Sequence, residues 1–380
     1  SDLNQNATEH NEPWPSGRPN HYLFDLNRDW VWASQVETKQ RLKLYNQWMP
    51  HIHVDFHEQG INEPYYFAPA AEPFHEVISD WQRKFQLQIG KNHAKYFDRE
   101  GWLFFTRERF DLLYPSYGDT YPTFMGAIGM TYEQAGHGRA GLGIDNDEGI
   151  KLTLVDRIKH HTTTSLSTVE ISSQNAKKLN EEFSQYFKND QLKYKSYVLN
   201  GNIDHKKKLT NLLNLHDIKW GYSVNNSISG FRYKIQKKGS IDAKNAIIVS
   251  TDQPKGKMVK TLFEPDTKLS NPLTYDITSW SLPYAYGLET VASTQLLESN
   301  ESKKIITIHN EPSLKSVGYI SHWTSMYDVS FLADLLLHDV KVRFSEKELS
   351  FNNISYARGS LIITRSDNKN KLYFDELITN

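Results

Sequence analysis

Three short apolar runs in the first half of the chain end on side chains that can bind ligands or move protons. HYLFDL is followed by Asn27-Arg28, HIHVDF by His57-Glu58, and GAIGMTY by Glu133. In open α/β sheets, ligands bind beyond the carboxyl ends of the strands. A histidine at such a strand end, with an acid and a glycine close behind it, is typical of a metal ligand. Each run alone is a weak signal, but the three together favour one functional site.

The sequence around these residues predicts an α/β sandwich that would position them. Short apolar segments predict strands over 21–26, 51–56 and 126–132. Apolar residues at helical spacing predict helices over 35–48, over most of 73–109 with a break near Gly90, and over 177–187. The polar residues would then lie at the carboxyl ends of the strands.

The second half contains an internal repeat. LLNLHDIKWGY (212–222) resembles DLLLHDVKVRF (334–344), so that His216-Asp217 matches His338-Asp339. A strand and a helix are expected before each copy, and an apolar strand after it. Two related β-α-β units are therefore predicted, and we expect the His-Asp pairs in equivalent turns after their helices rather than as ligands.

The motifs of the first half resemble those of a known family. DLNRD (25–29), DFHEQG (55–60) and MTYEQAG (130–136) are similar, in this order, to the signatures of the M14 family zinc carboxypeptidases. YYFAPAAEP (65–73) and YPSYGDTYP (114–122) resemble bacterial, secreted-type members. The resemblance implies a partial carboxypeptidase-like sheet with helices on both faces, and a secreted or periplasmic location.

The resemblance also implies roles for individual residues. Asn27 and Arg28 would bind the terminal carboxylate of a peptide substrate with a free C-terminus, because a guanidinium can hold a carboxylate through two parallel hydrogen bonds. His57 would be a ligand of Zn²⁺, which in hydrolases takes three protein ligands and a water. Glu133 would be the general base that takes the proton of that water and passes it to the leaving amine.

Two further assignments stay open at this stage. The family has a mobile tyrosine that covers bound substrate, and Tyr114 or Tyr117 could fill that role or could simply be packing aromatics. Glu58 could orient the metal ligands from outside, or it could be an acid that faces solvent.

The other two zinc ligands of the family come as His-x-x-Glu upstream of the Asn-Arg motif. None of the 15 histidines here has a glutamate three residues later. We therefore expect a fragment of a longer enzyme, cut at both ends, rather than a relative that has lost zinc. We expect no complete zinc site at His57 and no hydrolysis by this chain alone, although Glu133 and Arg28 should face one cleft. Sheet edges left exposed would favour self-association.

Composition excludes several classes of function. The 44 basic and 45 acidic residues nearly cancel, so nothing points to nucleic acid. The absence of cysteine excludes disulfides, thiol nucleophiles and cysteine-ligated zinc. It also excludes the cysteine-dependent amidotransferase activity with which domains following similar carboxypeptidases have been compared. No apolar run is long enough to span a bilayer.

We therefore predict a partial zinc-carboxypeptidase-like domain over 1–190, followed by α/β accessory units over 191–300 and 301–380, and we expect the second accessory unit to be incomplete. The expected function is that of a zinc-dependent metallo-exopeptidase that removes C-terminal residues. One alternative is a zinc amidohydrolase acting on peptidoglycan stem peptides or N-acyl amino acids. Another is a non-catalytic protein that binds peptide or glycan.

Overall fold

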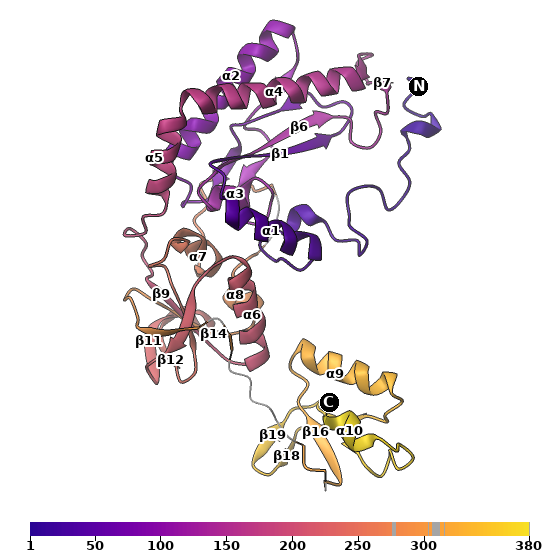
Figure 1. Ribbon diagram of the computed structural model, residues 1–380, viewed down its shortest axis with the longest axis vertical. Coiled ribbons are helices and arrows are strands. Elements are labelled where there is room, and N and C mark those ends of the chain that lie inside the picture. Colours follow the sequence, from indigo (N-terminus) through magenta and orange to yellow (C-terminus); the bar gives the residue numbers. More distant parts are fainter. Residues whose placement is uncertain (276–278, 303, 306–311, 315, 380) are drawn as a thin grey trace. The chain divides into compact units, whose positions relative to one another are not determined.

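The chain forms two compact units in the computed structural model, which describes residues 1–275, 279–302, 304–305, 312–314 and 316–379 (Figure 1). The first unit comprises Ser1–Asn200 with Thr210–Lys303, and the second comprises Gly201–Leu209 with Lys304–Asn380. The architecture is mixed α/β, as expected. The predicted boundary at residue 190 lies within the first unit and stays a prediction.

The first unit contains a four-stranded sheet in the order β1-β6-β2-β4. These strands are β1 (Ile52–Gln59), β6 (Ile128–Ala135), β2 (Tyr65–Tyr66) and β4 (Phe104–Phe105). β1 and β6 are parallel, in a register that places His57 opposite Glu133. Among the strands that the structure describes, β1 pairs only with β6, so it forms an edge of the sheet. Whether this edge pairs with another chain stays a prediction.

Helices cover both faces of this sheet, as Figure 1 shows. One face carries α2 (Asp80–Glu100) and α4 (Leu154–Gln174), and the other carries α1 (Val36–Trp48) and α3 (Thr120–Phe124). The core under α2 consists largely of aromatic and branched side chains, among them Phe85, Ile89, Phe97, Met130 and Tyr132. Burying one such side chain stabilises the fold by roughly 1.5–3 kcal/mol, so this layer holds the strands that carry the polar residues.

The predicted helix break at Gly90 is wrong, because α2 continues through it. A Cβ atom on residue 90 would lie 2.1 Å from the carbonyl oxygen of Ala68, so the glycine permits close packing instead of ending the helix. The helix begins with a capping box between Ser79 and Gln82. The predicted helices over 35–48 and 177–187 are confirmed as α1 and α5 (Ala176–Tyr186).

Replacing Gly90 with alanine is therefore expected to destabilise the first unit by about 2 kcal/mol, since the overlap requires a shift of the backbone at Ala68. Gly60→Ala is the matched control, because the nearest atom to its added Cβ would be Glu63 Cγ at 3.6 Å. Urea unfolding of both variants measures the difference. Equal stability of the two variants would contradict this account of Gly90.

The strand predicted over 21–26 is also wrong. Only an isolated bridge between Pro19 and Asp25 is present, and a 3-10 helix follows over Leu26–Arg28. The Asn20 side chain accepts hydrogen bonds from the backbone N–H groups of Tyr22 and Phe24. Asp25 does the same for the N–H of residue 27 at 2.8 Å. These local bonds compete with sheet pairing and fold the segment as turns.

A larger sheet of the first unit has seven strands, in the order β12-β11-β14-β9-β13-β10-β15, where β14 is Glu289–Ser293 and β15 is Ser299–Ser302. The first copy of the repeat consists of β9 (Ser196–Asn200), α6 (Ile203–Leu215), β10 (Trp220–Ser223) and, later, β13 (Ile247–Ser250). The part of α6 up to Leu209 is assigned to the second unit. β13 lies between β9 and β10 and is antiparallel to both. These four elements, β9, α6, β10 and β13, therefore form a split β-α-β arrangement. The hairpin of β11 (Ser227–Arg232) and β12 (Lys237–Asp242) precedes β13.

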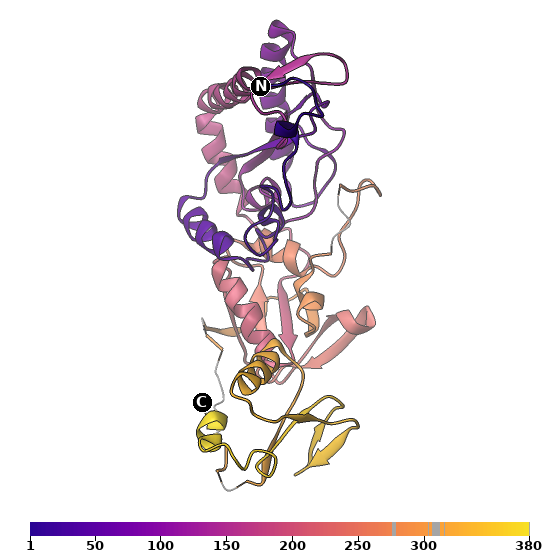
Figure 2. The ribbon, with the colours of Figure 1, turned by 90° about the vertical axis from the view of Figure 1, so that its right-hand side faces the viewer.

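The second unit repeats this order. Its elements are β16 (Gly318–Ser321), α9 (Met326–Leu337), β17 (Arg343–Phe344), a hairpin of β18 (Leu349–Phe351) and β19 (Ile354–Tyr356), and β20 (Leu361–Thr364). β20 lies between β16 and β17 and is antiparallel to both. α9 and α10 (Phe374–Thr379) share one core with β20 through Leu335, Phe374 and Ile363. Figure 2 shows the backbone of these two helices in orange and yellow. The two copies of the repeat therefore share one order and one pairing of their strands, as the sequence predicts.

The two His-Asp pairs occupy equivalent turns, also as predicted. Asp217 and Asp339 follow their helices with φ of 55° and 52°, and the N–H of each donates to a carbonyl in the last turn. The histidines differ. His216 is buried and contacts Tyr121 Oη at 2.9 Å, and burial lowers its pKa to about 4, whereas His338 is exposed. His216 is therefore a neutral core residue.

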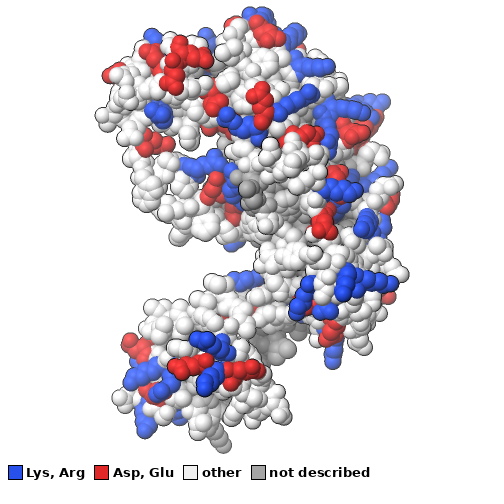
Figure 3. All heavy atoms as spheres, turned by 180° about the vertical axis from the view of Figure 1, so that it is seen from behind, with Lys and Arg blue, Asp and Glu red and all other residues white. Residues whose placement is uncertain are grey.

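No helix in the described part of the chain is both long and apolar enough to cross a membrane. On the face drawn in Figure 3, Lys and Arg side chains are interspersed with Asp and Glu rather than gathered in one area. The absence of a nucleic-acid partner stays a prediction.

Candidate functional site

Most of the predicted site residues line one small cavity in the first unit. The cavity measures about 50 Å³, and its lining includes Asn27, Arg28, His57, Tyr117 and Glu133. The other lining residues were not singled out from the sequence: Arg18, Phe110, Asp111, Asp119, Thr131 and Tyr275. Four separate stretches of the first 135 residues and one residue from beyond position 270 therefore meet at this point.

Tyr114 does not line this cavity. Its hydroxyl accepts a hydrogen bond from the indole N–H of Trp32 at 2.6 Å, and its ring packs against Tyr117 and Trp280. Of the two tyrosines suggested by the sequence, only Tyr117 therefore lies where it can contact a ligand in the cavity.

Adjacent parallel strands position the two central side chains. His57 and Glu133 are paired in register, so both point to the same face of the sheet. Both residues lie inside their strands, so the predicted strand ends at residues 56 and 132 were placed too early. Glu58 points to the opposite face and pairs with Arg157 at 2.9 Å. This placement agrees with the alternative in which Glu58 does not orient His57.

His57 is held by polar neighbours on both sides. Its Nε2 atom lies 2.9 Å from Asp55 Oδ2 and 3.1 Å from Asn27 Nδ2. Burial disfavours the imidazolium, but the hydrogen bond to Asp55 and the charges of Asp55 and Glu133 outweigh burial and raise the pKa of His57 above its ordinary value. When His57 is protonated, Nε2 donates to Asp55 and the two side chains form an ion pair.

Two carboxyl groups of the cavity have pKa values raised toward neutrality. Burial raises the pKa of Glu133 to about 7, although His57 opposes the shift. Burial also raises the pKa of Asp119 to about 6, while a hydrogen bond donated by the Thr131 hydroxyl opposes it. A carboxyl group with a pKa near the working pH can both accept and donate a proton, which is what general acid–base catalysis requires. Glu133 is therefore suited to proton transfer.

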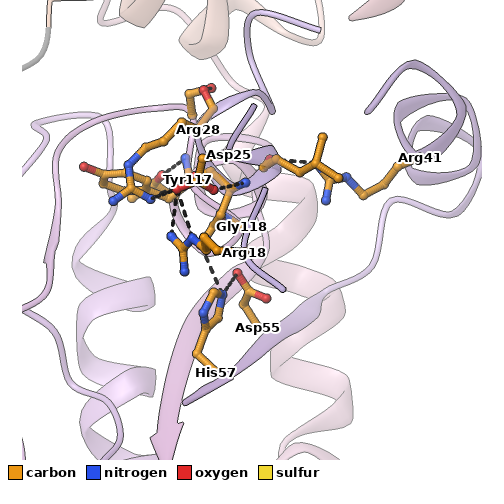
Figure 4. Close-up of polar contacts among 12 residues, drawn as sticks. Arg18, Asp25, Arg28, Arg41, Asp55, His57, Tyr117 and Gly118 are labelled. Atoms are coloured by element: carbon orange, nitrogen blue, oxygen red, sulfur yellow. Dashed lines mark hydrogen bonds and ion pairs between the residues drawn. The ribbon is translucent and has the colours of Figure 1, made fainter. Parts of the chain in front are cut away.

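Asp25 holds two guanidinium groups at the cavity. Its Oδ2 lies 2.9 Å from Arg18 Nη2 and 3.8 Å from Arg28 Nη1, and Figure 4 shows this cluster close to His57 and Asp55. The Arg28 guanidinium also lies 4.4 Å above the centre of the Tyr117 ring. Arg18 escaped the sequence analysis because it comes from a turn-rich segment without helix or strand periodicity. The cavity therefore combines two guanidinium groups with two carboxyl groups of raised pKa.

A glycine permits the close approach of these segments. The N–H of Gly118 donates to Asn27 Oδ1 at 2.6 Å, which fixes the orientation of the Asn27 amide. A Cβ atom on residue 118 would lie 2.0 Å from Asp55 Oδ2. Any side chain here would therefore displace Asp55 and, through it, His57.

His57 is the metal ligand that the sequence predicts, and zinc binding by this chain stays a prediction. Among the described residues, no group of three or more His, Cys, Asp or Glu side chains is arranged to hold a metal ion. The Nε2 atom of His57 faces Asp55 and Asn27 instead. We derive no metal-dependent step from this geometry, and zinc bound with ligands from outside this chain stays a prediction.

No protein-family model matches this chain, and neither the curated proteins nor the solved structures contain a match. The resemblance to zinc carboxypeptidases therefore rests on the sequence motifs alone.

Proposed function

We propose that this chain binds the free C-terminal carboxylate of a peptide and supplies the proton-transfer group of a carboxypeptidase-type hydrolase. The observation that carries the proposal is the shared cavity of Arg28, Asn27 and Glu133. A guanidinium and an amide suit a carboxylate, and a carboxyl group with a pKa of about 7 suits the exchange of a proton with a scissile amide.

The arrangement suggests a division of roles. A terminal carboxylate would share the guanidinium of Arg28 with Asp25 and receive a hydrogen bond from the Asn27 amide. Arg18 lines the same cavity and would stabilise negative charge that develops on the carbonyl oxygen of the scissile bond. Glu133 would take a proton from the attacking water and deliver it to the leaving amine.

The zinc-dependent form of this reaction would need metal ligands that the described residues do not provide. Of the steps of this reaction, we therefore assign carboxylate binding and proton transfer to this chain. A secreted or periplasmic location follows only from the resemblance and belongs to the same proposal. A second candidate is non-catalytic peptide binding, which is favoured by the position of His57 Nε2 between Asp55 and Asn27.

Binding of matched peptides to the purified chain tests the proposal. Acetyl-Gly-Gly-Ala with a free carboxylate is compared with the same peptide as its C-terminal amide, by isothermal titration calorimetry. Loss of a charge-assisted contact typically costs about tenfold or more in affinity, so the acid should bind at least that much more tightly than the amide. Equal affinity of the two peptides would overturn the proposed function.

A further inference from the structure

A segment from the second half of the chain reaches the candidate site. It covers residues 264–275 and directly follows α7 (Gly256–Phe263). The backbone N–H of Tyr275 donates to Asp111 Oδ2 at 2.6 Å, and the Ser270 hydroxyl donates to Glu72 Oε2 at 2.7 Å. Asp111 is buried, and its other oxygen accepts from the N–H of Leu113. The segment is therefore attached at two points to the part of the chain that forms the cavity.

The Tyr275 ring completes an aromatic wall of the cavity. Its centre lies 5.2 Å from the Phe110 ring and 6.1 Å from the Tyr117 ring. Tyr117 in turn carries the guanidinium of Arg28 on its face. The ring of Tyr275 is therefore one aromatic layer away from the group that we expect to bind the terminal carboxylate.

The space beside this wall is small. A cavity of about 50 Å³ holds a few water molecules, whereas pockets for larger ligands measure roughly 300–1,000 Å³. A bulky terminal side chain that faces this wall could fit only by displacing the Tyr275 ring from Phe110 and Tyr117. The adjoining hollow of about 700 Å³ shares Arg18, Asn27 and His57, is not lined by Tyr275 and leaves room for the rest of a peptide. A hydrogen, a methyl or a hydroxymethyl group would not require this displacement.

We propose that Tyr275 determines specificity by limiting the site to peptides whose terminal residue has a small side chain, such as glycine, alanine or serine. The inference rests on the proposed function, because it assumes that a peptide terminus occupies the cavity. Tyr275 is 42% exposed, so its removal would open the cavity toward solvent rather than leave a buried void. The bond to Asp111 comes from the backbone, so alanine at this position keeps the attachment of the segment.

The test measures the affinity of the full chain for acetyl-Gly-Gly-Ala and acetyl-Gly-Gly-Phe, both with free carboxylates. The parent protein should prefer the alanine peptide by at least about tenfold, the range over which the size of a pocket discriminates between side chains. In Tyr275→Ala the phenylalanine peptide should gain affinity by about tenfold while the alanine peptide changes little. Tyr275→Phe should keep the parent preference, since ring size and not the hydroxyl sets the limit.

Leu273→Ala is the matched control, because Leu273 belongs to the same segment, is exposed and does not line this cavity. An unchanged preference in Tyr275→Ala, with the acid still bound better than the amide, would overturn this inference alone. Failure of the parent to distinguish acid from amide would overturn the proposed function and the inference with it. If Tyr275 has only a structural role, Tyr275→Ala should bind both peptides more weakly by the same factor. This result would also count against the inference.

Discussion

Replacing Arg28 with alanine is expected to weaken binding of a peptide acid by about 100-fold and to leave binding of the corresponding amide nearly unchanged. The guanidinium lies over the Tyr117 ring and beside Asp25, and a guanidinium can hold a carboxylate through two parallel hydrogen bonds. Removing it leaves Arg18 as the other guanidinium among the described residues that line the cavity. Calorimetric titration with acetyl-Gly-Gly-Ala as acid and as amide measures both affinities.

Two further variants sharpen this experiment. Arg28→Lys keeps the charge but cannot form the two parallel bonds, so its affinity for the acid should lie between those of the parent and Arg28→Ala. Arg99→Ala removes an exposed guanidinium that pairs with Glu100 and does not line the cavity, and it should bind both peptides as the parent does. If Arg28→Ala loses affinity for acid and amide equally, Arg28 does not recognise the carboxylate.

The sequence was informative where a side chain that can bind a ligand or move a proton follows an apolar run. Asn27, Arg28, His57 and Glu133 each follow or end an apolar run, and all four line the same cavity. The repeat was equally readable, because the same apolar-His-Asp-apolar pattern ends two helices with the same left-handed aspartate.

Other features depend on contacts that local pattern does not reveal. α4 was missed because the helix buries polar side chains toward the sheet: Thr168 contacts the Tyr132 hydroxyl, and Ser167 contacts His93. Hydrogen bonds replace apolar contacts between this face of α4 and the sheet. Apolar residues therefore do not recur at helical spacing along this face in the sequence of α4. Tyr275 was missed for a different reason, since only the folded chain brings residues 264–275 to the cavity.

Glu133→Gln is expected to make the protein more stable at alkaline pH and to leave its stability unchanged in acid. Burial raises the pKa of Glu133 from an ordinary value of 4.5 to about 7. Between these values the folded chain holds a proton that the unfolded chain releases, so the contribution of Glu133 to stability falls as the pH rises through this window. A shift of this size corresponds to about 3 kcal/mol at pH 8, which a glutamine that cannot ionise would avoid.

The charges near Glu133 determine how much more stable Glu133→Gln is than the parent at alkaline pH. His57 favours the ionised form of Glu133, while Asp55 and Asp119 oppose it. Glutamine removes an anion that supports protonated His57, so the gain in stability should be at most about 3 kcal/mol at pH 8. Urea unfolding at pH 5 and pH 8, followed by tryptophan fluorescence, measures the gain, with the exposed Glu100→Gln as the control. A parallel pH dependence of Glu133→Gln and the parent would show that Glu133 ionises at an ordinary pH, and it would remove the physical basis for proton transfer by this residue near neutrality.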